Sequence, residues 1–126
     1  INGGLSGRHN KLVDGCYAYW VGACGSILKI YAYVNPINMP MLKSSILNYC
    51  QDNENTQPGL RVVPGMTADF YHTCYILMGL SPCEYEDDMY LPDLFSDAMS
   101  IKCTTIEGAQ VYEVNPVYGL PTYILN

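Results

Sequence analysis

The chain has 126 residues, the length of one small domain. Hydrophobic residues make up 49% of it and charged residues only 14%, and the chain is acidic, with a formal net charge of −6. This composition excludes a disordered chain, which needs low hydrophobicity and high charge, and it disfavours nucleic-acid binding, which needs a basic face. The charged fraction lies well below the ~25% of typical globular domains, so we expect much of the chain to be buried or to lie in an interface.

Glycine and proline residues divide the chain into a series of predicted helices. A glycine-containing loop over residues 1–13 leads into an apolar segment whose Tyr, Trp, Leu and Ile residues recur at helical spacing. The motif NPINMP predicts a turn before the second helix, a polar loop precedes the third, and we expect Ser81-Pro82 to end the third. The expected helices span residues 16–34, 41–51, 69–80 and 92–100.

The segment over residues 84–97 is strongly acidic. It holds six of the twelve acidic residues, and no Lys or Arg lies between Arg61 and Lys102. Such a run is typical of a solvated loop, and its functional alternative is a docking surface for a basic partner.

The lack of a recognisable targeting signal and the pattern of the cysteines predict a cytoplasmic protein. The longest uncharged apolar stretch, residues 15–28, is shorter than the ~20 residues of a membrane-spanning helix, so we expect no transmembrane segment. No leader peptide is recognisable. The six cysteines form no C-x-x-C pair, and we interpret them as reduced, mostly buried thiols.

The twelve tyrosines suit the lining of a semi-polar cavity, because each ring packs as an apolar group and carries a polar hydroxyl.

A short repeat occurs at an offset of 55 residues. Gly4-Leu5 corresponds to Gly59-Leu60, and Asp14 corresponds to Asp69 (59 − 4 = 55 and 69 − 14 = 55). An apolar predicted helix follows the Asp in both copies. This arrangement, used twice, indicates stacked helical hairpins.

Asp14, Cys16 and His72 form a candidate zinc site. They offer a carboxylate, a thiolate and an imidazole, and three protein ligands leave one zinc position open for chemistry. Residues i and i+2 of a regular helix point about 200° apart. Asp14 and Cys16 therefore meet only if Asp14 caps the helix, with a flexible step at Gly15. The ordinary alternatives, which spacing leaves open, are a helix cap, a buried thiol and a core histidine.

Arg8 and Lys11 lie in the glycine-containing loop before the first helix, with Tyr17 close by. Such a loop can hold a phosphate or diphosphate through charge-assisted hydrogen bonds. A solvated basic loop is the simpler interpretation, and the residues by themselves favour it.

Three segments resemble the motifs of protein prenyltransferase β subunits. The family's glycine-rich motif is similar to GGLSGRHNKLVDGCYAYW (residues 3–20), its downstream histidine motif to DFYHTCYILMGLS (69–81), and a C-terminal segment to NPVYGLP (115–121). The three occur in order over nearly the whole chain. Within the family, VDGCY and DFYHTCY look like the farnesyltransferase branch, whereas residues 20–23 also resemble geranylgeranyltransferase type I.

The resemblance implies an all-α fold, an α/α toroid of helical hairpins around an apolar funnel. Residues 1–126 would be the C-terminal part of that barrel, inactive without the rest of the β subunit and the prenyltransferase α subunit that forms the heterodimer. The resemblance assigns zinc to Asp14, Cys16 and His72, the diphosphate to Arg8, Lys11 and Tyr17, the isoprenoid to Trp20 and Tyr75, and the acceptor peptide to Tyr71.

The implied activity is transfer of farnesyl from farnesyl diphosphate to the cysteine thiol of C-terminal CaaX motifs, as in small GTPases. Zinc would hold the acceptor as a thiolate that attacks C1, while the basic loop stabilises the departing diphosphate. The family's acidic magnesium position falls on Val62, and a neighbouring basic position falls on Met66. We therefore expect weak Mg²⁺ dependence.

Two alternatives remain open at this point. One is a geranylgeranyltransferase type I β subunit, and the other is a non-catalytic helical-repeat binding module that retains the motifs. A terpene cyclase, which can share the toroid, is disfavoured because it needs acidic residues for cation chemistry and no Asp-Cys-His zinc set.

Overall fold

The computed structural model describes residues 3–51, 58–85, 103–106, 109–112, 114–116 and 118–121. The helical elements are α1 (Tyr17–Trp20), α2 (Gly22–Ala32), α3 (Met39–Ser45), the π-helix η1 (Ile46–Cys50) and α4 (Phe70–Tyr85). Two antiparallel strand pairs follow, β1 (Cys103–Ile106) with β2 (Ala109–Tyr112) and β3 (Val114–Asn115) with β4 (Leu120–Pro121).

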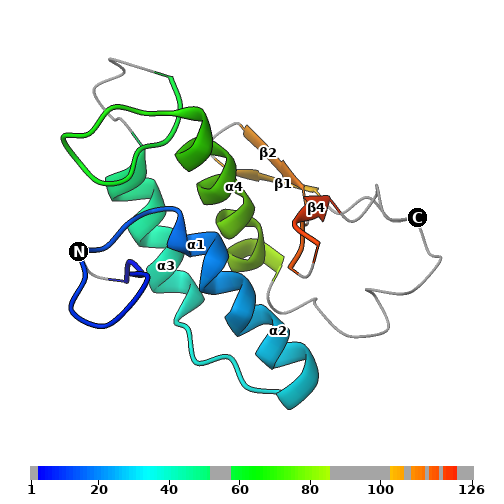
Figure 1. Ribbon diagram of the computed structural model, residues 1–126. Helices are drawn as coiled ribbons and strands as arrows, with labels where there is room; N and C mark the ends of the chain where they lie inside the picture. Colours follow the sequence, from blue (N-terminus) through cyan, green and yellow to red (C-terminus); the bar gives the residue numbers. More distant parts are fainter. Residues whose placement is uncertain are drawn as a thin grey trace.

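The helices form the body of the described chain. Figure 1 shows α1 and α2 following one another along one line, with α3 and α4 packed beside them and the strands on the α4 side. The helical packing agrees with the all-α expectation. The two short strand pairs are an addition that the sequence analysis did not predict, and the expected fourth helix over 92–100 lies outside the described residues.

The first predicted helix is confirmed but interrupted. A turn at Val21 separates α1 from α2, and α2 ends where Tyr33 adopts a left-handed conformation with φ of 56°. The second predicted helix begins two residues earlier than expected, at Met39, and its last turn is the π-helix η1. The early start has a clear cause, because the Asn38 side chain accepts a hydrogen bond from the Met41 amide and Pro40 fits the first helical turn.

The prediction that Ser81-Pro82 ends the third helix is wrong, since α4 continues through Pro82 to Tyr85. Proline in a helix interior removes one backbone hydrogen bond and usually breaks the helix. Here both residues are fully buried, and the Ser81 hydroxyl accepts a hydrogen bond of 2.8 Å from the Val114 amide. Tertiary contacts thus hold this turn helical. Glu84 in the next turn forms an ion pair with Lys43, and the acidic segment beyond Tyr85 lies outside the described residues.

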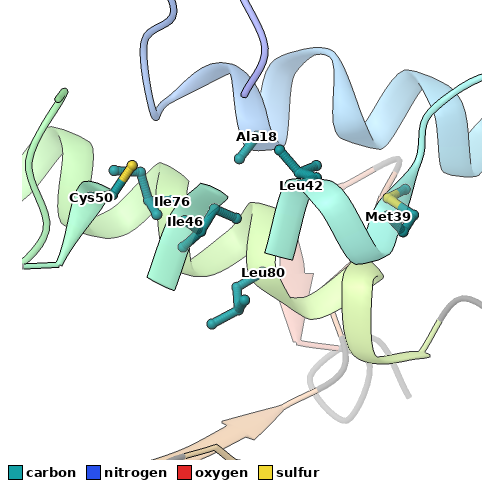
Figure 2. Close-up of a cluster of buried hydrophobic side chains, with 7 residues drawn as sticks. All are labelled: Ala18, Met39, Leu42, Ile46, Cys50, Ile76 and Leu80. Atoms are coloured by element: carbon teal, nitrogen blue, oxygen red, sulfur yellow. The ribbon is translucent and has the colours of Figure 1, made fainter. Parts of the chain in front are cut away.

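One apolar core joins the helices, and Figure 2 shows its side chains converging between α1, α3, η1 and α4. Burying one large aliphatic side chain stabilises a fold by about 1.5–3 kcal/mol. Helix α1 approaches α4 closely at Gly79, where an added Cβ would lie 2.4 Å from the carbonyl carbon of Ala18. The core consists of Ala18, Met39, Leu42, Ile46, Cys50, Ile76 and Leu80.

The expectation of reduced thiols is confirmed for Cys16, Cys24, Cys50 and Cys74, but the described cysteines are not mostly buried. Cys16 and Cys50 are buried and Cys83 is half-buried, whereas Cys24 and Cys74 are exposed on α2 and α4. Among the described helices, none has the length and apolar content needed to cross a membrane.

Candidate functional site

Asp14, Cys16 and His72 converge in the structure. One ligand atom from each residue lies within 4.8 Å of the other two, although 56 positions separate Cys16 from His72 in the sequence (72 − 16). Cys16 is buried, and Asp14 and His72 are half-buried. The set is therefore accessible from one side, as a site must be if a further ligand is to reach it.

The turn before α1 brings Asp14 and Cys16 together, but the expected cap position is wrong, because Cys16 caps α1 and Asp14 lies two residues before it. Asp14 precedes the helix, and its Oδ1 accepts a hydrogen bond of 3.0 Å from the Cys16 amide. Gly15 is needed for space, because an added Cβ would lie 2.6 Å from Ile76 Cδ1 and 2.8 Å from Cys50 Sγ. The Gly15 amide also donates to the Val62 carbonyl, which fixes this turn on the opposite loop.

His72 is delivered by the first turn of α4. Asp69 Oδ1 accepts from the His72 amide at 2.8 Å, and Asp69 Oδ2 lies 2.6 Å from His72 Nδ1. These hydrogen bonds lower the pKa of Asp69, the amide contact having the largest effect. His72 Nε2 then faces Asp14 Oδ1 at 3.3 Å. Sequence reasoning expected Asp69 to be a helix cap and missed its contact with the imidazole ring.

The two loops that lead to the site are closed in the same way. The Asp14 amide donates to the Leu5 carbonyl at 3.1 Å, and the Asp69 amide donates to the Leu60 carbonyl at 3.4 Å. The same hydrogen bond therefore closes both loops at equivalent positions. The proposed repeat is confirmed as a structural one, and both Asp residues lie at the entry to a helix.

The donor set suits zinc. Three protein ligands that offer nitrogen, sulfur and oxygen are typical of zinc sites with an open position. In such sites a carboxylate usually binds the imidazole nitrogen that does not face the metal, and so orients the ring. Burial, followed by the hydrogen bond and negative charge of Asp14, raises the pKa of the Cys16 thiol to about 11. If a cation bound here, the sulfur would coordinate it as a thiolate and the thiol proton would be released to solvent, because the positive charge reverses the local electrostatics.

Arg8, Lys11 and Tyr17 line one open pocket of about 1220 Å³ that reaches Asp14. The basic loop is tightly folded here, since a Cβ at Gly7 would lie 2.3 Å from the Tyr17 hydroxyl. The opposite wall of the pocket is apolar. Sequence reasoning named two members of this wall, Val62 and Met66, and missed Val63 and Pro64.

The aromatic residues expected near the site form one cluster. The Trp20 and Tyr75 rings lie 4.5 Å apart, and the Tyr71 and Tyr75 rings lie 4.8 Å apart. The Trp20 indole N–H donates to the Tyr71 hydroxyl at 3.2 Å, and the Tyr71 hydroxyl is near enough to Cys16 to oppose, in part, the rise in the pKa of that thiol. The sequence analysis missed Tyr19, a buried ring 5.2 Å from Trp20 and 5.7 Å from Tyr75.

Comparison with known proteins adds independent findings. The family profile described as the prenyltransferase alpha-alpha toroid domain matches residues 1–120. The protein farnesyltransferase subunit beta of Saccharomyces cerevisiae is 46% identical over 121 residues, which cover 94% of this chain and 27% of that protein. Its counterpart in Schizosaccharomyces pombe is 37% identical over 123 residues, covering 94% and 32%. The geranylgeranyl transferase type-2 subunit beta of S. cerevisiae is 38% identical over 85 residues, covering 68% and 24%. The chain thus spans about a third or less of the length of these relatives.

Proposed function

Because the chain belongs to the prenyltransferase α/α toroid family, we propose that it is the C-terminal part of the β subunit of a zinc-dependent protein farnesyltransferase. The observation that carries the proposal is the convergence of Asp14, Cys16 and His72 beside a pocket whose lining includes two basic side chains. Farnesyl diphosphate and proteins ending in CaaX are the substrates we propose, with an α subunit as the partner.

Zinc is the cofactor that these residues fit. Asp14, Cys16 and His72 would hold it, and bound zinc would lower the pKa of the acceptor's cysteine thiol. The chain itself fixes the ligand geometry. Asp69 keeps the His72 ring oriented with Nε2 toward the site, and the Asp14 carboxylate is held by the Cys16 amide.

The basic loop would bind the diphosphate. Arg8 and Lys11 carry fixed positive charge into the pocket, and Tyr17 adds a hydroxyl that can donate a hydrogen bond as negative charge grows on the leaving group. Magnesium has little support here, because the wall facing this loop presents Val62 and Met66 instead of carboxylates. We expect millimolar Mg²⁺ to change the turnover rate only weakly, and a strong requirement in turnover assays would contradict this.

The aromatic cluster would hold the two substrates in place. Trp20 and Tyr75 offer ring faces to the isoprenoid, and the half-exposed Tyr71 lies between these rings and Cys16, where the acceptor peptide would end. We further propose a cytoplasmic location, which the reduced thiols of Cys16, Cys24, Cys50 and Cys74 support.

The test uses the heterodimer that contains the full-length β subunit. We expect one bound zinc per heterodimer and transfer of farnesyl to a CaaX peptide in preference to geranylgeranyl when both diphosphates compete. A preference for geranylgeranyl would support the geranylgeranyltransferase alternative. A native protein that binds no zinc and transfers neither group would overturn the catalytic proposal in favour of a binding module.

A further inference from the structure

The C-terminal motif NPVYGLP has no role in the function proposed above, yet its turn packs against the aromatic cluster. The cluster has an exposed side and a buried side. Trp20 is 42% exposed, whereas Tyr19, which contacts both Trp20 and Tyr75, is only 9% exposed. Tyr19 therefore supports the two rings from behind, and whatever fixes Tyr19 also fixes the depth at which they lie.

The turn behind Tyr19 is held by several hydrogen bonds. The Gly119 amide donates to the Asn115 carbonyl at 2.8 Å, and the Tyr118 amide donates to the Asn115 side chain at 3.2 Å. Asn115 is itself buried, and it pairs with Leu120 across the β3–β4 register. These hydrogen bonds hold Tyr118 and Gly119 next to Asn115.

The turn is also anchored to α4. The Val114 amide donates to the Ser81 hydroxyl at 2.8 Å, and both residues are buried. This contact joins the turn to the same helix that carries Tyr75. The position of the turn relative to the aromatic cluster is therefore set by α4.

Gly119 is the point where the turn contacts the cluster. An added Cβ would lie 2.6 Å from the Tyr19 hydroxyl and 2.7 Å from Met78 Cε, so only glycine leaves Tyr19 where it is. We propose that Gly119 is a specificity-determining position that sets the length of the isoprenoid by fixing Tyr19 behind Trp20 and Tyr75. The inference rests on the proposed function, since it requires those rings to contact the isoprenoid.

The experiment compares geranyl, farnesyl and geranylgeranyl diphosphates with one CaaX peptide, using the full heterodimer. In Gly119→Ala the Tyr19 ring has to move, and because this ring contacts both Trp20 and Tyr75, we expect the space that these two rings leave for the isoprenoid to become shorter. One methylene in an apolar pocket changes kcat/KM by about 10–200-fold. We therefore expect kcat/KM for farnesyl diphosphate to fall about tenfold or more, with the value for geranyl diphosphate changed less than about threefold.

Tyr19→Phe removes the hydroxyl that the new methyl group would meet. The double variant should restore the farnesyl-to-geranyl ratio to within about threefold of wild type, and Tyr19→Phe alone should raise relative use of geranylgeranyl diphosphate. Gly65→Ala is the matched control, because Gly65 has φ of +85° and nothing within 4 Å of an added Cβ. Gly65→Ala introduces similar backbone strain, and the farnesyl-to-geranyl ratio of kcat/KM should stay as in the wild type.

A second readout does not depend on turnover. The indole N–H resonance of Trp20 in ¹⁵N-tryptophan-labelled heterodimer, assigned with Trp20→Phe, should shift in Gly119→Ala and return in the double variant. Wild-type transfer with an unchanged ratio in a folded Gly119→Ala heterodimer, or no rescue by Tyr19→Phe, overturns the role of Gly119 alone. Absence of any transfer by the wild type overturns the proposed function instead.

Discussion

The loop over residues 5–13 and the loop over residues 60–68 have the same construction and opposite chemistry. Each is closed by a hydrogen bond from an Asp amide to a Leu carbonyl nine residues earlier (14 − 5 and 69 − 60), and both line the same pocket. The first loop places Arg8 and Lys11 there. At the offset of 55 residues the second loop has Val63 and Met66. The backbone therefore sets the positions, and the side chains decide what each wall binds.

The two Asp residues that end these loops have different roles. Asp14 faces the other ligands of the candidate metal site, whereas Asp69 holds the imidazole of His72. One copy of the repeat thus supplies two ligands, and the other supplies one ligand together with the group that orients it. Substitutions at the ligands and at Asp69 should therefore differ in their effect on zinc binding.

The largest effect is expected from the ligands. Cys16→Ser or His72→Ala should each abolish zinc binding, because two remaining ligands hold zinc poorly. Metal content of the purified heterodimer measures this. Cys24→Ser is the matched control, since Cys24 is an exposed thiol outside the ligand set, and it should retain one zinc. Full zinc occupancy in the Cys16→Ser protein would show that the metal site lies elsewhere.

The orienting carboxylate should matter less than a ligand. Asp69→Asn keeps a good helix cap but weakens the contact with the His72 ring. Loss of such a support typically lowers metal affinity about 10–100-fold. Competition with a zinc chelator measures the change. Asp14→Asn should lower the zinc affinity more than Asp69→Asn does. An equal loss of affinity in the two variants would mean that the two Asp residues do not have different roles.

The sequence predicted much of this site because its signals are local. A turn at Gly15 that joins Asp14 to Cys16 follows from residue types and spacing, as does the repeat, and the structure has both, although Cys16 and not Asp14 caps the helix. The resemblance supplied what spacing left open, namely that His72 and the basic loop belong to the same site. The structure brings these residues together.

The misses share a physical cause, which is tertiary packing. Pro82 predicts a helix end, but its burial and the Ser81–Val114 hydrogen bond keep α4 intact. Tyr19 is one of twelve tyrosines in the sequence, and its burial, its ring contacts and its contact with Gly119 become visible in the structure alone. Contacts between segments distant in the chain leave no periodic pattern in either one.

A smaller effect is expected from Gly15→Ala, which tests the space between the loops. The new methyl group would overlap Ile76 and Cys50, and overpacking of this kind typically costs about 1–3 kcal/mol. We expect a lower midpoint of thermal unfolding for the heterodimer. Gly22→Ala is the matched control, because its Cβ would lie 3.6 Å from Leu42 Cδ2, an ordinary contact. Equal midpoints for both variants would contradict the close approach at Gly15.

The smallest effect concerns the charge difference between the loops. Met66→Lys would place a third cation at the position equivalent to Lys11, in the wall that now lacks charge. Met66 is 56% exposed, so solvent screens the new charge and the gain should be about 0.2–1 kcal/mol. Inhibition by inorganic pyrophosphate should then tighten by up to about fivefold, and added salt should reduce the gain. Met41→Lys, exposed on α3 and outside the pocket lining, should leave inhibition unchanged. An equal gain in both variants would indicate a general charge effect, and the second loop would then not face the diphosphate.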